Sequence, residues 1–83
     1  MGQKVRRVIS KFMHGHDDLA GRIDVTHIPF EEIRKVVEAG VDDPLMYDGY
    51  ELTSDQLSAL QSYISERLDS SKYDYFIEAE SVE

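Results

Sequence analysis

The alternation of apolar and polar residues near the N-terminus predicts two strands. Residues 5–13 mix β-branched and basic side chains, and in residues 20–28 Ile23 and Val25 alternate with polar neighbours, which is typical of half-buried strands. The stretch between them, "HGHDDL", contains a glycine and two aspartates and has the composition of a turn. These segments therefore predict an antiparallel β-hairpin.

Two later segments carry the apolar spacing of three or four residues that marks an amphipathic helix. The first, residues 29–40, starts with a proline and ends with a glycine, which suit the two ends of a helix. The second, residues 53–68, begins at Thr53, which forms a capping box with Gln56 three residues later. Its apolar stripe comprises Leu57, Leu60, Ile64 and Leu68.

The remaining segments are a loop at residues 41–52 and a final strand at about residues 73–79. The predicted order is ββααβ in a single domain, residues 1–83, because a chain of this length has no room for a second core. We expect an α+β two-layer sandwich in which two helices cover one face of a three-stranded, mainly antiparallel sheet. Such a sheet leaves its other face to solvent.

The final strand, within "KYDYFIEAE", divides its side chains into two different faces because strand side chains alternate. The face expected beneath the helices comprises Tyr73, Tyr75, Ile77 and Ala79. The exposed face comprises Lys72, Asp74, Phe76, Glu78 and Glu80, with Asp24 from the second strand. An apolar side chain ringed by carboxylates suits a basic protein partner, since the apolar group supplies affinity and the charges supply steering. We also expect an apolar residue of the first strand on this face; the alternative is that Phe76 packs under a loop and the carboxylates are only solvated.

The charge of the chain narrows the class of partner. The net charge is −8, and it is uneven: residues 1–35 hold seven basic and five acidic side chains, whereas residues 36–83 hold two and twelve. This balance disfavours nucleic acid and anionic membranes as partners and favours basic proteins, although an acidic surface also serves solubility alone. The sequence has no long apolar run, no signal-peptide pattern and no cysteine. We therefore expect a cytoplasmic protein.

Two motifs offer competing chemistry. The "HGHDD" turn holds His14, His16 and Asp17, which are metal-ligand types, so a metal-dependent function is one alternative. A tight turn rarely brings enough ligands together, so we predict a polar turn, no metal and no cofactor, and an ordinary sheet position for His27. With no nucleophile beside a base and no phosphate-binding glycine loop, we predict no enzyme and no catalytic residue.

The loop at residues 41–52 is a second candidate surface, because tyrosine is enriched at protein interfaces and this loop combines it with aspartates. It lacks the spacing of a calcium-binding loop. Its candidate partner-binding residues are Asp42, Asp43, Tyr47, Asp48 and Tyr50. Alternatively, the tyrosines of this loop cover an edge of the core.

Residues 68–80, "LDSSKYDYFIEAE", resemble the C-terminal strand of the cloacin immunity family, in which a similar turn precedes a Lys-aromatic-Asp-Tyr-Phe core and acidic residues. In this chain the core is Lys72, Tyr73, Asp74, Tyr75 and Phe76. The opening "MGQKV" is also similar, and the middle of the chain resembles a loose group of small uncharacterised bacterial proteins, some from toxin–immunity systems. The helix expected at residues 53–68 departs from the strand meander of the cloacin-type proteins, so the resemblance bears on the role and not on the fold.

The resemblance implies an immunity protein: a cytoplasmic inhibitor that binds and neutralises a basic nuclease toxin, with an RNase as the first candidate, delivered by neighbouring cells. Because a nuclease binds a polyanion, its substrate cleft is basic, and the carboxylates of the final strand would occlude it. The alternative function is an acidic adaptor or regulatory domain that binds a basic protein of the same cell.

Overall fold

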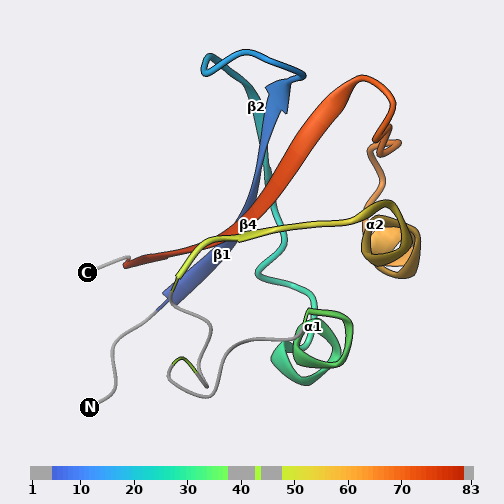
Figure 1. Ribbon diagram of the computed structural model, residues 1–83. Coiled ribbons are helices and arrows are strands. Elements are labelled where there is room, and N and C mark those ends of the chain that lie inside the picture. The colour runs from blue at the N-terminus through green and yellow to red at the C-terminus, as the bar shows by residue number, and fades with distance from the viewer. Residues whose placement is uncertain (1–4, 38–42, 44–47, 82–83) are drawn as a thin grey trace.

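The sheet of this α+β protein is built around its two longest strands. β1 (Val5–Met13) and β4 (Tyr73–Ser81) pair antiparallel at its centre, although they come from opposite ends of the chain. β2 (Leu19–Asp24) pairs with β1 through the predicted hairpin, and β3 (Tyr50–Glu51) pairs with β4, which gives the order β2-β1-β4-β3 (Figure 1). The computed structural model describes residues 5–37, 43 and 48–81.

The hairpin confirms the predicted turn but shortens the second strand. Gly15 has a φ of 75° in the turn, a conformation that glycine adopts without a steric cost. β2 ends at Asp24 and does not continue to residue 28, because the Asp24 carboxylate accepts a hydrogen bond from the backbone N–H of Thr26 at 2.9 Å and closes an Asx turn. The prediction that His27 is a sheet residue is therefore wrong, since it lies in this turn.

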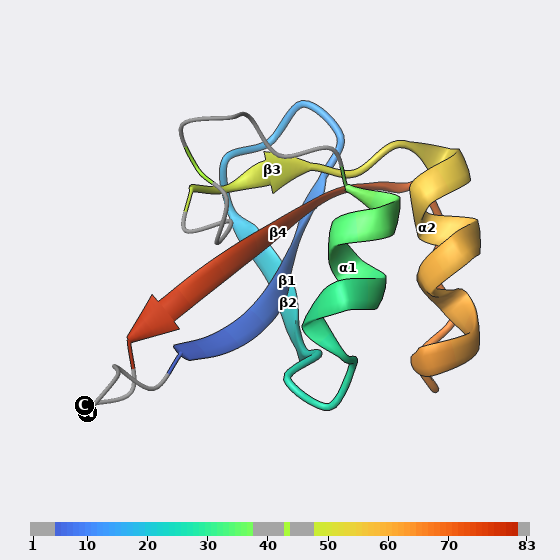
Figure 2. The same cartoon turned by 90° about the horizontal axis from the view of Figure 1, so that it is seen from below.

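Both helices lie on the same side of the sheet and enclose the apolar core between the two layers (Figures 1 and 2). α1 (Phe30–Val36) and α2 (Ser54–Leu60) also contact each other. The largest fully buried side chains come from both layers and the segments that join them: Tyr75, Ile9, Ile33, Leu60 and Val25. Within the described part of the chain, no helix is long and apolar enough to cross a bilayer.

The predicted start of α2 is confirmed, but its predicted end is wrong. The Thr53 hydroxyl accepts a hydrogen bond from the N–H of Gln56 at 3.2 Å, and the Gln56 side chain accepts one from the N–H of Thr53 at 2.8 Å. The helix was predicted to reach residue 68, yet it ends at Leu60 and is followed by one turn of 3-10 helix, Gln61–Tyr63. α1 likewise ends at Val36, short of the predicted residue 40, which lies outside the described residues.

The side chain of Gln61 explains why the chain leaves the helix after α2. Its amide donates to the carbonyls of Ile64 at 3.1 Å and Glu66 at 2.8 Å, and its Oε1 accepts the N–H of Leu68 at 2.9 Å. These bonds satisfy backbone groups that a longer helix would have paired internally. Ile64 is still buried and Leu68 still packs against the core, but neither belongs to a helix.

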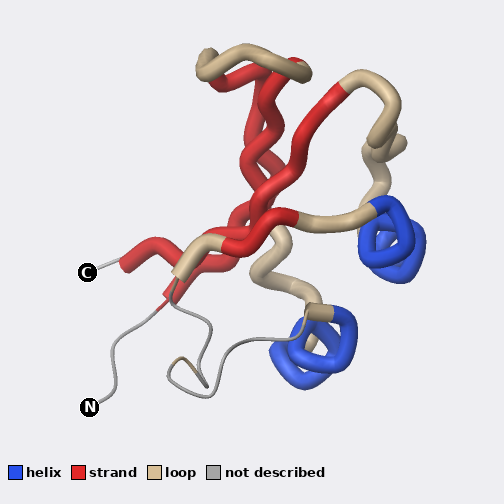
Figure 3. Tube along the Cα trace, viewed as in Figure 1, coloured by secondary structure: helices blue, strands red, loops and turns tan. Residues whose placement is uncertain are grey.

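The sheet has four strands where three were predicted (Figure 3). The additional strand, β3, lies in the segment that was predicted to be a loop, and its two residues pair with Ile77 and Phe76 of β4. Two residues are too few to produce an alternating pattern, so this strand leaves no signal in the sequence.

Candidate protein-binding face

The face of the sheet away from the helices, which we call the open face, receives side chains from all four strands. Val8 pairs with Glu78 and Ser10 pairs with Phe76, so these side chains share one face, whereas Ile9 belongs to the core. By the same register, the open face comprises Arg6, Val8, Ser10 and Phe12 from β1, Leu19, Arg22 and Asp24 from β2, Glu51 from β3, and Asp74, Phe76, Glu78 and Glu80 from β4. The structure therefore brings together the phenylalanine and the four carboxylates that the sequence assigned to this face.

Three apolar side chains form a strip across the open face. The rings of Phe12 and Phe76 pack edge to face, with centroids 5.7 Å apart and an interplanar angle of 82°. Leu19 of β2 lies opposite Phe12 and is 51% exposed. Phe12 and Phe76 are half-buried. Partly exposed apolar side chains that adjoin one another and are rimmed by polar ones are a feature of interaction sites. Phe12 is thus the apolar residue that the first strand was expected to contribute.

A groove of about 540 Å³ opens beside the two phenylalanines. We call it the Phe groove, and its lining consists of Phe12, Gly15, His16, Asp17, Asp74, Phe76 and Glu78. It contains three carboxylates and, among the described lining residues, no lysine or arginine. In the described part of the chain Asp17 and Glu78 form no ion pair, and the pair shown for Asp74 is with His14, with 3.7 Å between His14 Nε2 and Asp74 Oδ1.

The buried Ser10 fixes the position of one of these carboxylates. The Ser10 side chain is only 3% exposed, and its hydroxyl donates a hydrogen bond to Glu78 Oε1 at 2.5 Å. The hydroxyl is neutral, so this bond brings no positive charge to Glu78. The bond therefore orients the charge beside Phe76 without cancelling it.

At the end of the open face away from the Phe groove, the carboxylates are paired with arginines. Arg6 Nε lies 3.8 Å from Asp24 Oδ2, and Arg22 forms an ion pair with Glu80. Hydrogen bonding from the Thr26 side chain and N–H also lowers the pKa of the Asp24 carboxyl. Two of the predicted partner-binding carboxylates, Asp24 and Glu80, thus already have an arginine partner within the protein.

The pair between Arg22 and Glu80 also covers the middle of β1. Arg22 lies opposite Ser10, and Glu80 lies opposite Arg6. The line between them crosses β1 at the level of Val8, which is 4% exposed although it faces away from the helices. Among the described residues of this face, therefore, only those at the Phe groove end combine accessible apolar surface with carboxylates that have no lysine or arginine partner.

The second candidate surface is only partly described. Asp42 and Tyr47 lie outside the described residues. Asp43 Oδ2 accepts hydrogen bonds from the N–H of Asp48 at 2.9 Å and from the hydroxyl of Tyr50 at 2.6 Å, so this carboxylate closes the loop on itself. Tyr50 is half-buried against the core, and it therefore covers a core edge on the helix side of the sheet.

The "HGHDD" turn contributes lining to the Phe groove. The His14 Nε2–H donates to the carbonyl of Ser70 at 2.9 Å, and His16 and Asp17 line the groove. No three His, Asp or Glu side chains in the described ranges are grouped in a way that could hold a metal ion. The arrangement shown is a turn that extends the wall of the groove.

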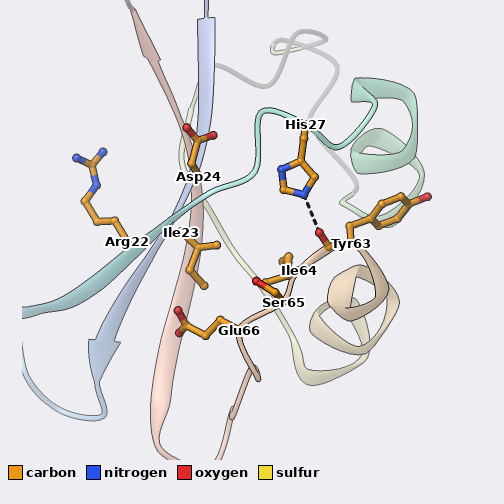
Figure 4. Close-up of a pocket in the computed structure, with 8 residues that line it drawn as sticks. All are labelled: Arg22, Ile23, Asp24, His27, Tyr63, Ile64, Ser65 and Glu66. Carbon is orange, nitrogen blue, oxygen red and sulfur yellow. Dashed lines mark hydrogen bonds between the residues drawn. The ribbon is translucent and has the colours of Figure 1, made fainter.

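A second hollow, of about 370 Å³, lies between β2 and the segment after α2 (Figure 4). The His27 Nε2–H donates to the carbonyl of Tyr63 at 2.6 Å and ties the two sides together. Its charged lining residues already have partners: Arg22 pairs with Glu80, and Glu66 accepts a hydrogen bond from Lys11 at 2.8 Å that raises the pKa of the lysine. This hollow is a weaker candidate for a charged partner than the Phe groove.

Sequence reasoning expected an apolar residue of the first strand on this face without identifying Phe12, and it did not place Asp17 or Leu19 there. The first strand carries apolar and basic residues on both of its faces, so its sequence does not show which face is open. The pairing of Ser10 with Phe76 places Phe12, two residues after Ser10, on the same face as Phe76, and the two rings are in contact. Asp17 was considered only as a metal ligand. Its place in the groove depends on how the turn folds toward β4, which local sequence does not encode.

The model of one protein family, a domain of unknown function (DUF7683), matches residues 6–78. This range extends from β1 through both helices to Glu78 of β4, and it includes every residue of the Phe groove. No curated protein matches the chain.

Proposed function

The chain belongs to the DUF7683 family, and we propose that it is a cytoplasmic immunity protein that binds and neutralises a basic nuclease toxin, with an RNase as the first candidate. The observation that carries the proposal is the Phe groove end of the open face. There an apolar strip of Leu19, Phe12 and Phe76 adjoins carboxylates that have no lysine or arginine partner among the described residues.

The physical chemistry of this surface favours a basic protein over other partners. The apolar strip gains affinity when water is removed from it, and the carboxylates then need cations from the partner in place of that water. The net charge of −8 speeds the encounter with a basic surface. A nuclease presents such a surface because its substrate is a polyanion, and the resemblance of residues 68–80 to the cloacin immunity family supports this class of partner.

The inhibitor acts by occlusion in this proposal. Asp74 and Glu78 face the basic substrate cleft or the patch beside it, and Phe76 buries its ring against the partner. A charge pair that loses one member in such an interface costs about 2–5 kcal/mol. Reversal of the Glu78 charge is therefore expected to weaken binding at least about tenfold.

The test compares three immobilised proteins: wild type, Glu78→Lys, and a control, Glu31→Lys, that makes the same change in net charge on α1. Lysate from the source organism is passed over each at moderate salt, and the nuclease activity of the captured protein is assayed with increasing wild-type protein. We expect capture by wild type and Glu31→Lys, loss by Glu78→Lys, and inhibition that saturates at equal concentrations. Capture of a partner without nuclease activity would replace this function with the adaptor, and equal capture by Glu78→Lys would exclude the open face as the site.

A further inference from the structure

The charges on the open face are divided between its two ends. At one end, Arg6 with Asp24 and Arg22 with Glu80 form ion pairs. At the other end, Asp17, Asp74 and Glu78 line the Phe groove without a lysine or arginine among the described residues. We propose that the Phe groove is a binding site for one arginine side chain of the protein partner, an inference that rests on the proposed function because it names the group received there.

The groove favours a cation for electrostatic reasons. Three carboxylates around one hollow repel one another, and a positive group placed among them removes that repulsion and adds attraction. The turn residues His14 and His16 are the titratable bases near these carboxylates, and His14 Nε2 stands 3.7 Å from Asp74 Oδ1. The described lining of the groove includes no lysine or arginine, so these carboxylates have no permanently charged cation among them.

The aromatic wall selects arginine over lysine. A guanidinium group is planar, stacks on an aromatic ring and donates two parallel hydrogen bonds to a carboxylate, whereas an ammonium group is compact and strongly hydrated. Cation–ring contacts of both kinds occur elsewhere in the same protein: the guanidinium carbons of Arg7 and Arg34 lie 4.7 Å and 5.9 Å from the ring centroid of Phe30, and Lys11 Nζ lies 4.6 Å from that of Tyr73. The Phe groove offers the corresponding rings, Phe12 and Phe76, beside acceptors.

The orientation of Glu78 adds a defined acceptor. Ser10 occupies Glu78 Oε1, and no other described residue is shown to bond Oε2. A carboxylate held in this way has lost most of its rotamer freedom before the partner arrives, so binding costs less conformational entropy. An arginine stacked on the phenylalanine rings therefore finds an acceptor that is already fixed in place.

The experiment titrates the whole protein with N-acetyl-arginine-methylamide and, separately, with the lysine analogue, while NMR follows the aromatic resonances of Phe12 and Phe76. We expect the arginine compound to shift these resonances and to bind about fivefold more tightly than the lysine compound. The variant Phe12→Leu, which keeps an apolar side chain but removes the ring, should lose this preference, whereas Glu31→Gln should retain it. Core methyl resonances confirm that each variant is folded.

Equal affinity for both compounds, or shifts spread over the acidic surface without a response at Phe12 and Phe76, would overturn the arginine site. This result is separable from failure of the proposed function. A groove that selects arginine in a protein that captures no nuclease supports the site and rejects the toxin. A nuclease that is lost by Glu78→Lys but bound equally by wild type and Phe12→Leu supports the function and rejects the site.

Discussion

At the residue scale, two aspartates outside the Phe groove hold turns at the ends of strands. Asp24 accepts from Thr26 after β2, and Asp69 Oδ1 accepts from the N–H of Ser71 at 3.0 Å and from its hydroxyl at 2.5 Å before β4. Hydrogen bonding from the side chain and then the N–H of Ser71 lowers the pKa of Asp69, as hydrogen bonding from Thr26 lowers that of Asp24. The folded protein therefore favours the ionised form of both carboxyls.

The substitution Asp69→Asn tests this effect, because asparagine keeps an acceptor oxygen but loses the charge. A folded-state pKa below the unfolded value means that the stabilisation is fully present above the unfolded pKa, about 3.9, and is lost as the pH falls through the lower folded value. We expect the variant to be less stable than wild type at neutral pH and the difference to shrink below about pH 4. Urea unfolding across this range measures it, with Ser71→Ala as the control that removes one donor. A difference that stays constant with pH would show that the charge of Asp69 is not the cause.

The candidate site was predictable in part at this same scale. The strict alternation of the final strand is sufficient to place Asp74, Phe76 and Glu78 on one face, and the register confirms that they share it. Alternation could not select the face of β1 that opens to solvent, because Phe12 shares its face with Arg6 and Ser10 while Ile9 shares the other with Arg7 and Lys11. The choice is made by the core contacts of Ile9, which are long-range.

At the element scale, the helices show what periodicity can predict and where it stops. The four residues of the apolar stripe predicted in segment 53–68 all reach the core, as their spacing predicted, but only Leu57 and Leu60 do so from the α-helix. Extended chain after the 3-10 turn brings Ile64 and Leu68 to the same core, so the apolar spacing alone cannot mark the end of the helix. The end is set by the side chain of Gln61, whose backbone partners are visible only in the folded chain.

The capping box is the feature of α2 that the sequence predicts best, and its removal should lower the free energy of unfolding. Thr53→Ala leaves the N–H of Gln56 without its acceptor, and we expect the free energy of unfolding to fall by about 1 kcal/mol. The loss also loosens Gln56, whose amide donates to the carbonyl of Val36 at 3.2 Å and joins α2 to α1. Urea denaturation of wild type, Thr53→Ala and Thr53→Ser measures it. Serine retains the hydroxyl and should retain most of the stability; a serine variant as unstable as the alanine variant would assign the effect to the lost methyl group.

At the scale of the whole molecule, the net charge and the local groove make separate contributions to binding. The charge of −8 acts over distances comparable with the Debye length, about 10 Å at 0.1 M salt, and attracts a basic partner before any contact is made. The carboxylates of the Phe groove act after contact, where water has been removed. The net charge therefore affects mainly the association rate, and the groove carboxylates affect mainly the dissociation rate.

The two charge reversals already introduced separate these contributions when binding kinetics to the captured partner are measured at low and high ionic strength. Glu31→Lys and Glu78→Lys change the net charge equally, so both should slow association and weaken its salt dependence. Only Glu78→Lys removes a carboxylate that the partner contacts, because Glu31 is exposed on α1 and Glu78 lines the groove. We therefore expect the dissociation rate to rise at least about tenfold for Glu78→Lys and to stay near the wild-type value for Glu31→Lys. Equal dissociation rates for the two variants would mean that net charge alone attracts the partner, and that the division of charges across the open face plays no part in holding it.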